Sequence, residues 1–169
     1  MIHLELTREE PWPDHDWDAL AKRAATAAIE RTPHGQLLTT TAAVEISVRL
    51  TTVDEVRQLN HQYRQKDKPT NVLSFAMVQP DLLDTVSQNS DDGELLLGDI
   101  VLAYGVCVAE AAERGIVVED HVTHLLVHGT LHLLGYDHLV EDEAEAMEEI
   151  ERDALAALEI GDPYLIRED

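Results

Sequence analysis

Three histidines, at positions 128, 132 and 138 of the segment HGTLHLLGYDH, have the spacing of a metal site. On an α-helix, His128 and His132 project from one face about 6 Å apart along the axis, so both imidazoles can bind one zinc ion. Gly135 is placed to end this helix, and the turn after it would carry His138 back over the other two. Three neutral imidazoles leave the fourth zinc position open, as in catalytic sites. The spacing therefore predicts one catalytic Zn²⁺ per chain.

The residue after the first histidine bears on the reaction. The spacing H-x3-H-x2-G-x2-H is that of metzincin proteases, which carry a glutamate directly after the first histidine as general base. This chain has Gly129 there, which cannot accept a proton. A zinc peptidase or another metal-dependent hydrolase stays an alternative, provided that an acidic residue reaches the metal from elsewhere in the chain.

Two further histidines lie on the same helical stripe. His124 and His121 precede His128 by one and two turns. They could relay protons or contact a substrate, or they could be polar residues near the start of a helix. The sequence leaves both interpretations open.

The histidine segment resembles the H-G-x-L-H-L-x-G-Y-D-H signature of the YbeY-type endoribonucleases, also called rRNA maturation factors. Two other blocks are similar to the same family: Leu59-Asn60 with YRQKDKPTNVLSF at 63–75, and Gly98-Asp99-Ile100. The blocks follow one another in the family's order and span positions 59–138.

This resemblance implies a zinc ion on His128, His132 and His138 and metal-dependent cleavage of single-stranded RNA. It also implies maturation of ribosomal RNA, notably of the small-subunit 3′ end, and ribosome quality control. A further alternative is a non-catalytic ribosome-assembly module, in which zinc only braces the helix end and a fourth protein ligand, such as Asp137, closes the metal position.

The resemblance also assigns roles outside the histidines. Arg64 matches the family's important arginine, and its guanidinium can hold a phosphate through two hydrogen bonds and stabilise charge on it. We expect Lys66 and Lys68 to follow the RNA backbone. Asp137 and His124 are candidates for the general base, although Asp137 could equally orient a metal ligand. Whether water or the RNA 2′-hydroxyl attacks is left open.

The formal charge of −22 predicts repulsion from nucleic acid and from anionic membranes. Twelve acidic residues against two arginines fall in 139–169. We expect a locally basic strip beside an acidic C-terminal helix, no DNA partner, and help from a ribosomal protein or assembly factor in docking RNA. Five of the twelve basic residues fall between positions 49 and 68: Arg49, Arg57, Arg64, Lys66 and Lys68.

Cys107 is the only cysteine, which excludes an intrachain disulfide and a cysteine-based zinc site. The N-terminus lacks the pattern of a signal peptide, and no apolar run reaches the length of a membrane span. We expect a cytoplasmic protein without membrane contact, folded as one domain over residues 1–169.

Hydrophobic periodicity predicts an α+β fold: a small mixed four-stranded sheet covered by about five helices, with the metal site at the C-terminal end of a helix. Asp14 or Asp16 is placed to cap the first helix, Thr52 and Glu55 form a capping-box pattern, and 79–93 reads as a loop. The expected strands are 2–6, 44–50, 71–77 and 94–103. One helix is expected to begin near Trp17, and four more are expected at 53–62, 104–114, 119–134 and 141–159. The last of these helices should bury Met147, Ile150, Ala154 and Leu158.

Overall fold

The computed structural model of this chain describes residues 2–40, 43–78, 94–136 and 141–163. Within these ranges it contains a four-stranded mixed sheet, five α-helices and one short 3-10 helix, so the predicted α+β fold is confirmed. The loop expected at 79–93 lies outside the described residues. In chain order the elements are β1 (Ile2–Arg8), α1 (Trp17–Glu30), η1 (Gly35–Leu38), β2 (Ala43–Thr51), α2 (Val53–Arg64), β3 (Val72–Ala76), β4 (Glu94–Ala103), α4 (Tyr104–Arg114), α5 (Val118–Leu133) and α6 (Glu141–Ala157).

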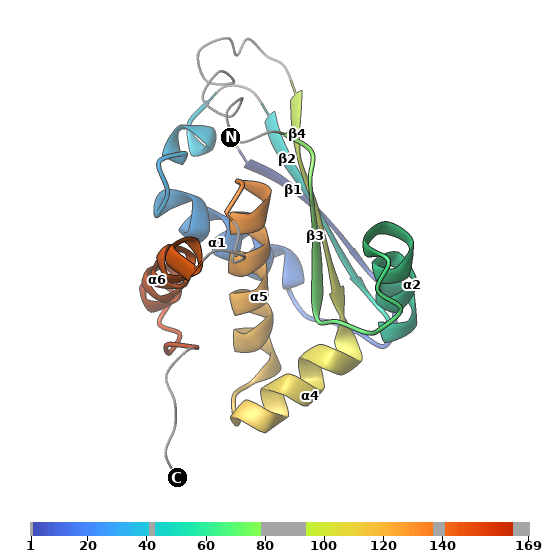
Figure 1. The fold of residues 1–169 in the computed structure, drawn as a ribbon. Helices are drawn as coiled ribbons and strands as arrows, with labels where there is room; N and C mark the ends of the chain where they lie inside the picture. The colour runs from blue at the N-terminus through green and yellow to red at the C-terminus, as the bar shows by residue number, and fades with distance from the viewer. Residues whose placement is uncertain (1, 41–42, 79–93, 137–140, 164–169) are drawn as a thin grey trace.

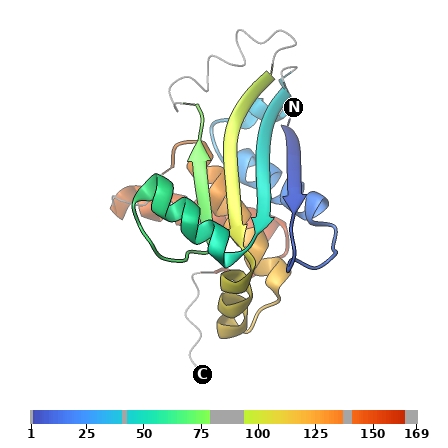
Figure 2. The same cartoon turned by 90° about the vertical axis from the view of Figure 1, so that its right-hand side faces the viewer.

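The strands are ordered β1-β2-β4-β3 across the sheet. The first three are parallel, and β3 adds to the edge antiparallel to β4, with Ser74 opposite Ile100. Helices cover both faces (Figure 1): α1 and α5 lie on one face with α6 packed against them, and α2 lies on the other. Figure 2 looks onto the sheet with α2 in front of it.

The main core lies between the sheet and the layer of α1, α5 and α6. Alternate residues of β2 supply it, because successive side chains of a strand point to opposite faces. Val44, Ile46, Val48 and Leu50 are buried in this way. A smaller cluster under α2 joins Val56 to Leu73, Val101 and Ala103 on the opposite face.

A bulge in β4 changes which residues face this core. Glu45 pairs with Leu96 and Ile46 with Gly98, so Leu97 is the extra residue. Leu97 and Ile100 are both buried, and Asp99 lies on the opposite face. Strict alternation from Leu97 would have turned the Asp99 carboxylate into the apolar core.

The predicted helix starts are formed, with one difference. Asp16 caps α1, its Oδ1 accepting from the Ala19 amide at 3.2 Å. Thr52 caps α2, its Oγ1 accepting from the Glu55 amide at 3.1 Å. In a full capping box the Glu55 carboxylate would also accept from the Thr52 amide. This part of the prediction is wrong, because the carboxylate accepts instead from Thr51 Oγ1 at 2.6 Å.

The acidic helix α6 ends at Ala157, two residues before the predicted end, so Leu158 lies outside the helix. Met147 and Ala154 are buried as predicted, whereas Ile150 is only half-buried. Its neighbour Glu151 is fully buried. None of the helices in the four described ranges combines the length and the apolar character of a membrane span.

Candidate functional site

The two histidines of the predicted metal pair face each other on α5. His128 Nε2 and His132 Nε2 are 2.9 Å apart, and the ring centroids are separated by 4.5 Å with planes at 81°. The helix therefore brings these nitrogens to one point, as the four-residue spacing predicts. The other two residues predicted around this point, Asp137 and His138, lie outside the described residues.

The helix carrying the pair ends just beyond His132. Gly135 has a φ of 98°, a conformation that favours glycine. Its amide donates to the His132 carbonyl at 3.0 Å, and the Tyr136 amide donates to the Leu131 carbonyl at 3.1 Å. These two bonds form a Schellman motif. The helix thus stops where the sequence analysis placed its end.

Each ring of the pair is held through its other nitrogen. His132 Nδ1 lies 2.8 Å from the Tyr136 carbonyl oxygen, which can only accept, so this nitrogen carries the proton. His128 Nδ1 lies 2.8 Å from Glu151 Oε1, and an ionised carboxylate likewise only accepts. Both Nε2 atoms then present lone pairs to each other at 2.9 Å. A proton or a metal ion held between the two nitrogens relieves the repulsion of their lone pairs.

The donor set suits zinc, nickel or copper, all of which imidazole binds. Two imidazole nitrogens on one tetrahedral zinc are about 3.3 Å apart, so the observed 2.9 Å needs only a small side-chain rotation. Among the residues with described positions, no group of three or more His, Cys, Asp or Glu forms a metal cluster. His128 and His132 therefore offer two ligand nitrogens, and the described residues bring no third group of these kinds to them.

Glu151 contacts two of these histidines and was not predicted from the sequence. This residue of α6 has 0% exposure, and its Oε1 contacts both His128 Nδ1 and His124 Nε2, the latter at 3.2 Å. A signal was available, because position 151 is four residues after Met147 and three before Ala154, both on the predicted buried stripe. An acidic residue on such a stripe needs a partner.

His121 and His124 are both buried, and His121 lies in the first turn of α5. His121 Nε2 lies 2.9 Å from Glu110 Oε1, which also accepts from Asn71 Nδ2 at 2.9 Å. Burial lowers the pKa of His121, although Glu110 acts in the opposite direction. The structure thus assigns His124 to the Glu151 contact and His121 to a separate group with Glu110.

A cavity of about 730 Å³ lies beside the histidine pair. Its walls include His128 and His132 from α5, and Arg64, Lys66 and Lys68 from the end of α2 and the following turn. The structure therefore brings the three predicted phosphate contacts to the same cavity as the two histidines. A cavity with cationic and imidazole walls suits a phosphate group.

Arg64 is held at the edge strand. Its Nη2 donates to the Ser74 carbonyl at 2.7 Å, and its Cζ lies 5.6 Å from the centre of the Phe75 ring. A guanidinium has five N–H donors, and the described contacts use one. Arg64 can therefore be oriented by β3 and still donate to an anion in the cavity.

Two of the five cations in the predicted basic strip form ion pairs with acidic side chains. Arg49 pairs with Glu9 at 2.7 Å and with Glu55 at 2.6 Å, and Arg57 pairs with Asp67 at 2.8 Å. These tertiary pairs neutralise two of the five cations.

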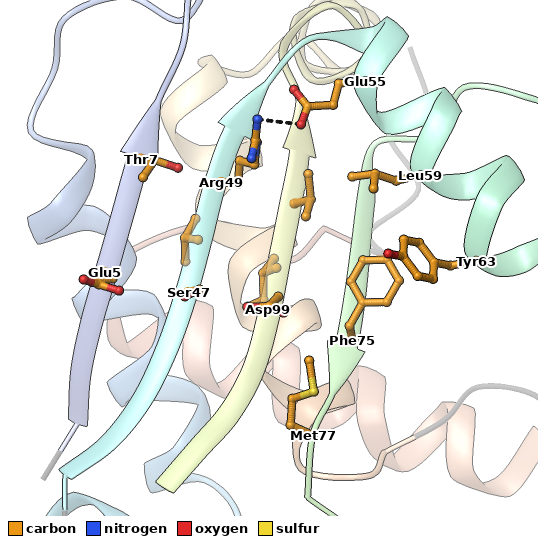
Figure 3. Close-up of a pocket in the computed structure, with 13 residues that line it drawn as sticks. Glu5, Thr7, Ser47, Arg49, Glu55, Leu59, Tyr63, Phe75, Met77 and Asp99 are labelled. Carbon is orange, nitrogen blue, oxygen red and sulfur yellow. Dashed lines mark ion pairs between the residues drawn. The ribbon is translucent and has the colours of Figure 1, made fainter. Parts of the chain in front are cut away.

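Arg49 belongs to a second cavity, of about 590 Å³, on the sheet face that α2 covers. Figure 3 shows its ion pair with Glu55, and Glu5 and Asp99 on neighbouring strands. This cavity carries more acidic than basic side chains. The cations that remain beside the histidines are Arg64, Lys66 and Lys68.

Gly129, the residue after the first histidine, lies close to the sheet. A Cβ atom on Gly129 would lie 3.0 Å from Ser74 Oγ and 3.1 Å from Ile100 Cγ2. These atoms of β3 and β4 fill the space that a longer side chain needs. A glutamate at this position, the usual base of the peptidase alternative, would have to displace the Ser74 and Ile100 side chains.

Residues 7–159 match the protein family described as "Endoribonuclease YbeY". Proteins of that name from Rhizorhabdus wittichii and Sphingopyxis alaskensis are 61% and 52% identical to this chain. The first alignment covers 100% of both chains, and the second covers 97% of this chain and 98% of the relative. The solution structure of TM1509 from Thermotoga maritima aligns with a TM-score of 0.55 at 22% identity, over 98% of this chain and 100% of that one, which is a similarity of fold.

Proposed function

This chain belongs to the YbeY endoribonuclease family, and from that premise we propose that it is a zinc-dependent endoribonuclease acting on single-stranded RNA. The proposed ligands are His128, His132 and His138, in one catalytic domain spanning residues 1–169. The observation that carries the proposal is the pair of Nε2 atoms on α5, 2.9 Å apart, with the Nδ1 atom of each ring 2.8 Å from an oxygen acceptor. Such a pair is suited to share a cation.

A zinc ion bound there would polarise a phosphate oxygen and lower the pKa of a bound water. The chain's own residues would orient the RNA. Arg64, held by the Ser74 carbonyl, donates to the scissile phosphate, and Lys66 and Lys68 contact neighbouring phosphates. Asp137 is the proposed base or the group that orients a ligand. His124 is poorly suited as the base, because its Nε2 already contacts Glu151 in the interior.

The proposed substrate is ribosomal RNA in the cytoplasm, notably the 3′ end of the small-subunit RNA, with a role in ribosome quality control. The net charge of −22 opposes tight binding of free RNA. A basic ribosomal protein or an assembly factor would supply the affinity that this surface lacks. No DNA or membrane partner is proposed.

The test compares zinc content and cleavage of a single-stranded RNA carrying the small-subunit 3′ sequence in three variants. His128→Ala should lose both zinc and cleavage. Arg64→Ala should keep zinc and lose about 10²- to 10³-fold in cleavage rate, the effect typical of removing one transition-state donor. Arg57→Ala is the matched control, because Arg57 pairs with Asp67 and does not line the histidine cavity. Full cleavage by metal-free His128→Ala would refute the proposal.

X-ray absorption of the zinc-loaded protein separates this function from the non-catalytic alternative. Three nitrogen ligands and one exchangeable water are expected for the enzyme, whereas a closed shell of four protein ligands without metal-dependent turnover would favour the structural role. Incubation with a peptide library tests the peptidase alternative.

A further inference from the structure

We propose that Glu151 is a positioning residue for the metal pair, which fixes the His128 ring so that Nε2 points at the shared ion. This inference rests on the metal binding of the proposed function and extends it to α6, a helix outside the histidine motif. The contact joins residues 23 positions apart, with His128 Nδ1 at 2.8 Å from Oε1.

Burial makes this contact specific. Glu151 has 0% exposure, and a carboxylate removed from water is costly unless hydrogen bonds compensate it. Two imidazoles approach the same oxygen, His128 at 2.8 Å and His124 at 3.2 Å. A carboxylate in this position can only accept, so it selects the form of His128 that is protonated at Nδ1. The lone pair of His128 is then left on Nε2, the atom facing His132.

The two rings of the pair are oriented by different means. His132 is held by the Tyr136 carbonyl at the end of its own helix. His128 depends on a side chain from another helix, so its orientation requires α6 to be docked against α5. His124 contacts the same carboxylate from one turn earlier on α5 and so helps to keep Glu151 aimed at His128. Partners of this kind fix the tautomer and orientation of metal-bound histidines.

Removal of the carboxylate should therefore weaken metal binding without removing a ligand. Loss of such a partner typically lowers metal affinity about 10- to 100-fold. Glu151→Gln keeps an acceptor oxygen but no charge, and its amide can also donate, so it no longer selects one His128 tautomer. Glu151→Ala removes both the acceptor and the charge and should weaken zinc binding at least as much.

The experiment measures zinc affinity by competition with a chromophoric chelator in the full chain. The matched control is Glu149→Gln, which removes the same charge from an exposed position of the same helix. The expected result is a rise of about 10- to 100-fold in the zinc dissociation constant for Glu151→Gln and wild-type affinity for the control. Equal zinc affinity in folded Glu151→Gln and the wild type would overturn the inference.

A second measurement needs no variant at position 151. Nitrogen-15 NMR of the metal-free wild-type protein, with ring signals assigned through His128→Gln, reports which nitrogen of His128 carries the proton. The inference requires protonated Nδ1, and a proton on Nε2 alone overturns it even if Glu151 variants fail to fold. RNA cleavage stands apart from both measurements. A wild type that binds zinc but leaves RNA intact refutes the proposed nuclease and leaves the role of Glu151 standing.

Discussion

Alanine at position 129 tests how closely α5 packs on the sheet. The added Cβ would lie 3.0 Å from Ser74 Oγ, and 3.1 and 3.2 Å from two carbons of Ile100. Ordinary contacts begin at 3.4 Å, so the atoms are too close by about 0.2 to 0.4 Å. Two of the three opposing atoms belong to a fully packed isoleucine, so either this side chain or the helix must move.

Two effects of opposite sign set the magnitude. Glycine in a helix interior costs about 1 kcal/mol relative to alanine, so the substitution gains that amount from helix propensity. Overpacking of a close-packed interior costs about 1 to 3 kcal/mol. The overlap involves three atoms from two strands, and we therefore expect Gly129→Ala to lose about 1 kcal/mol net. For a chain of this length that lowers the melting temperature by about 2 to 4 °C.

Urea denaturation and thermal melting, both followed by circular dichroism, measure the change. Gly35→Ala is the control, because a Cβ there meets nothing within 4 Å, and it should be neutral or stabilising. Gly129→Glu should lose more stability than Gly129→Ala, since its carboxylate would press against Ser74 and Ile100. A Gly129→Ala protein that melts at or above the wild-type temperature would show that α5 does not approach the sheet this closely.

Three further predictions concern titration and charge. Burial raises the pKa of Cys107 to about 12, so iodoacetamide should not modify it in the native protein and should modify it after unfolding in urea. Burial lowers the pKa of His121, so the unfolded state binds the extra proton more readily and the free energy of unfolding falls as pH drops below about 6.5. Urea titrations at several pH values below about 6.5 should show a smaller loss of unfolding free energy in His121→Gln than in the wild type. The exposed-site control His3→Gln should lose as much as the wild type. Replacing Lys66 and Lys68 together by alanine should reduce the slope of log affinity against log salt for single-stranded RNA by about 1.4, and an unchanged slope would exclude phosphate contacts by both.

Features that depend on nearby residues were predictable from sequence. His128 and His132 meet because a four-residue spacing on a helix brings them together wherever that helix lies. Gly135 ends the helix through a local backbone conformation. The strand Glu94–Ala103 follows from its composition and was predicted with its observed bounds. Each of these conclusions uses information contained within about ten residues.

Features that depend on tertiary contacts were not predicted from the sequence. Glu151 belongs to the His128 contact only because α6 docks against α5, and nothing near position 128 indicates this. Arg49 was expected in a basic strip, but its partner Glu9 is 40 positions away in sequence. The partner of a charged side chain depends on how the elements pack, which periodicity alone does not specify.

The edge strand β3 has a consequence for what each cavity can contain. Ser74 and Ala76 border the cavity beside the histidines, whereas Phe75 and Met77 border the cavity that Arg49 lines. Consecutive residues of one short strand thus belong to two separate compartments. A slip of β3 by a single residue along β4 would exchange their contents, bringing the aromatic ring toward the histidines and the hydroxyl to the far side. The alignment of this one strand therefore determines the chemical lining of both compartments together.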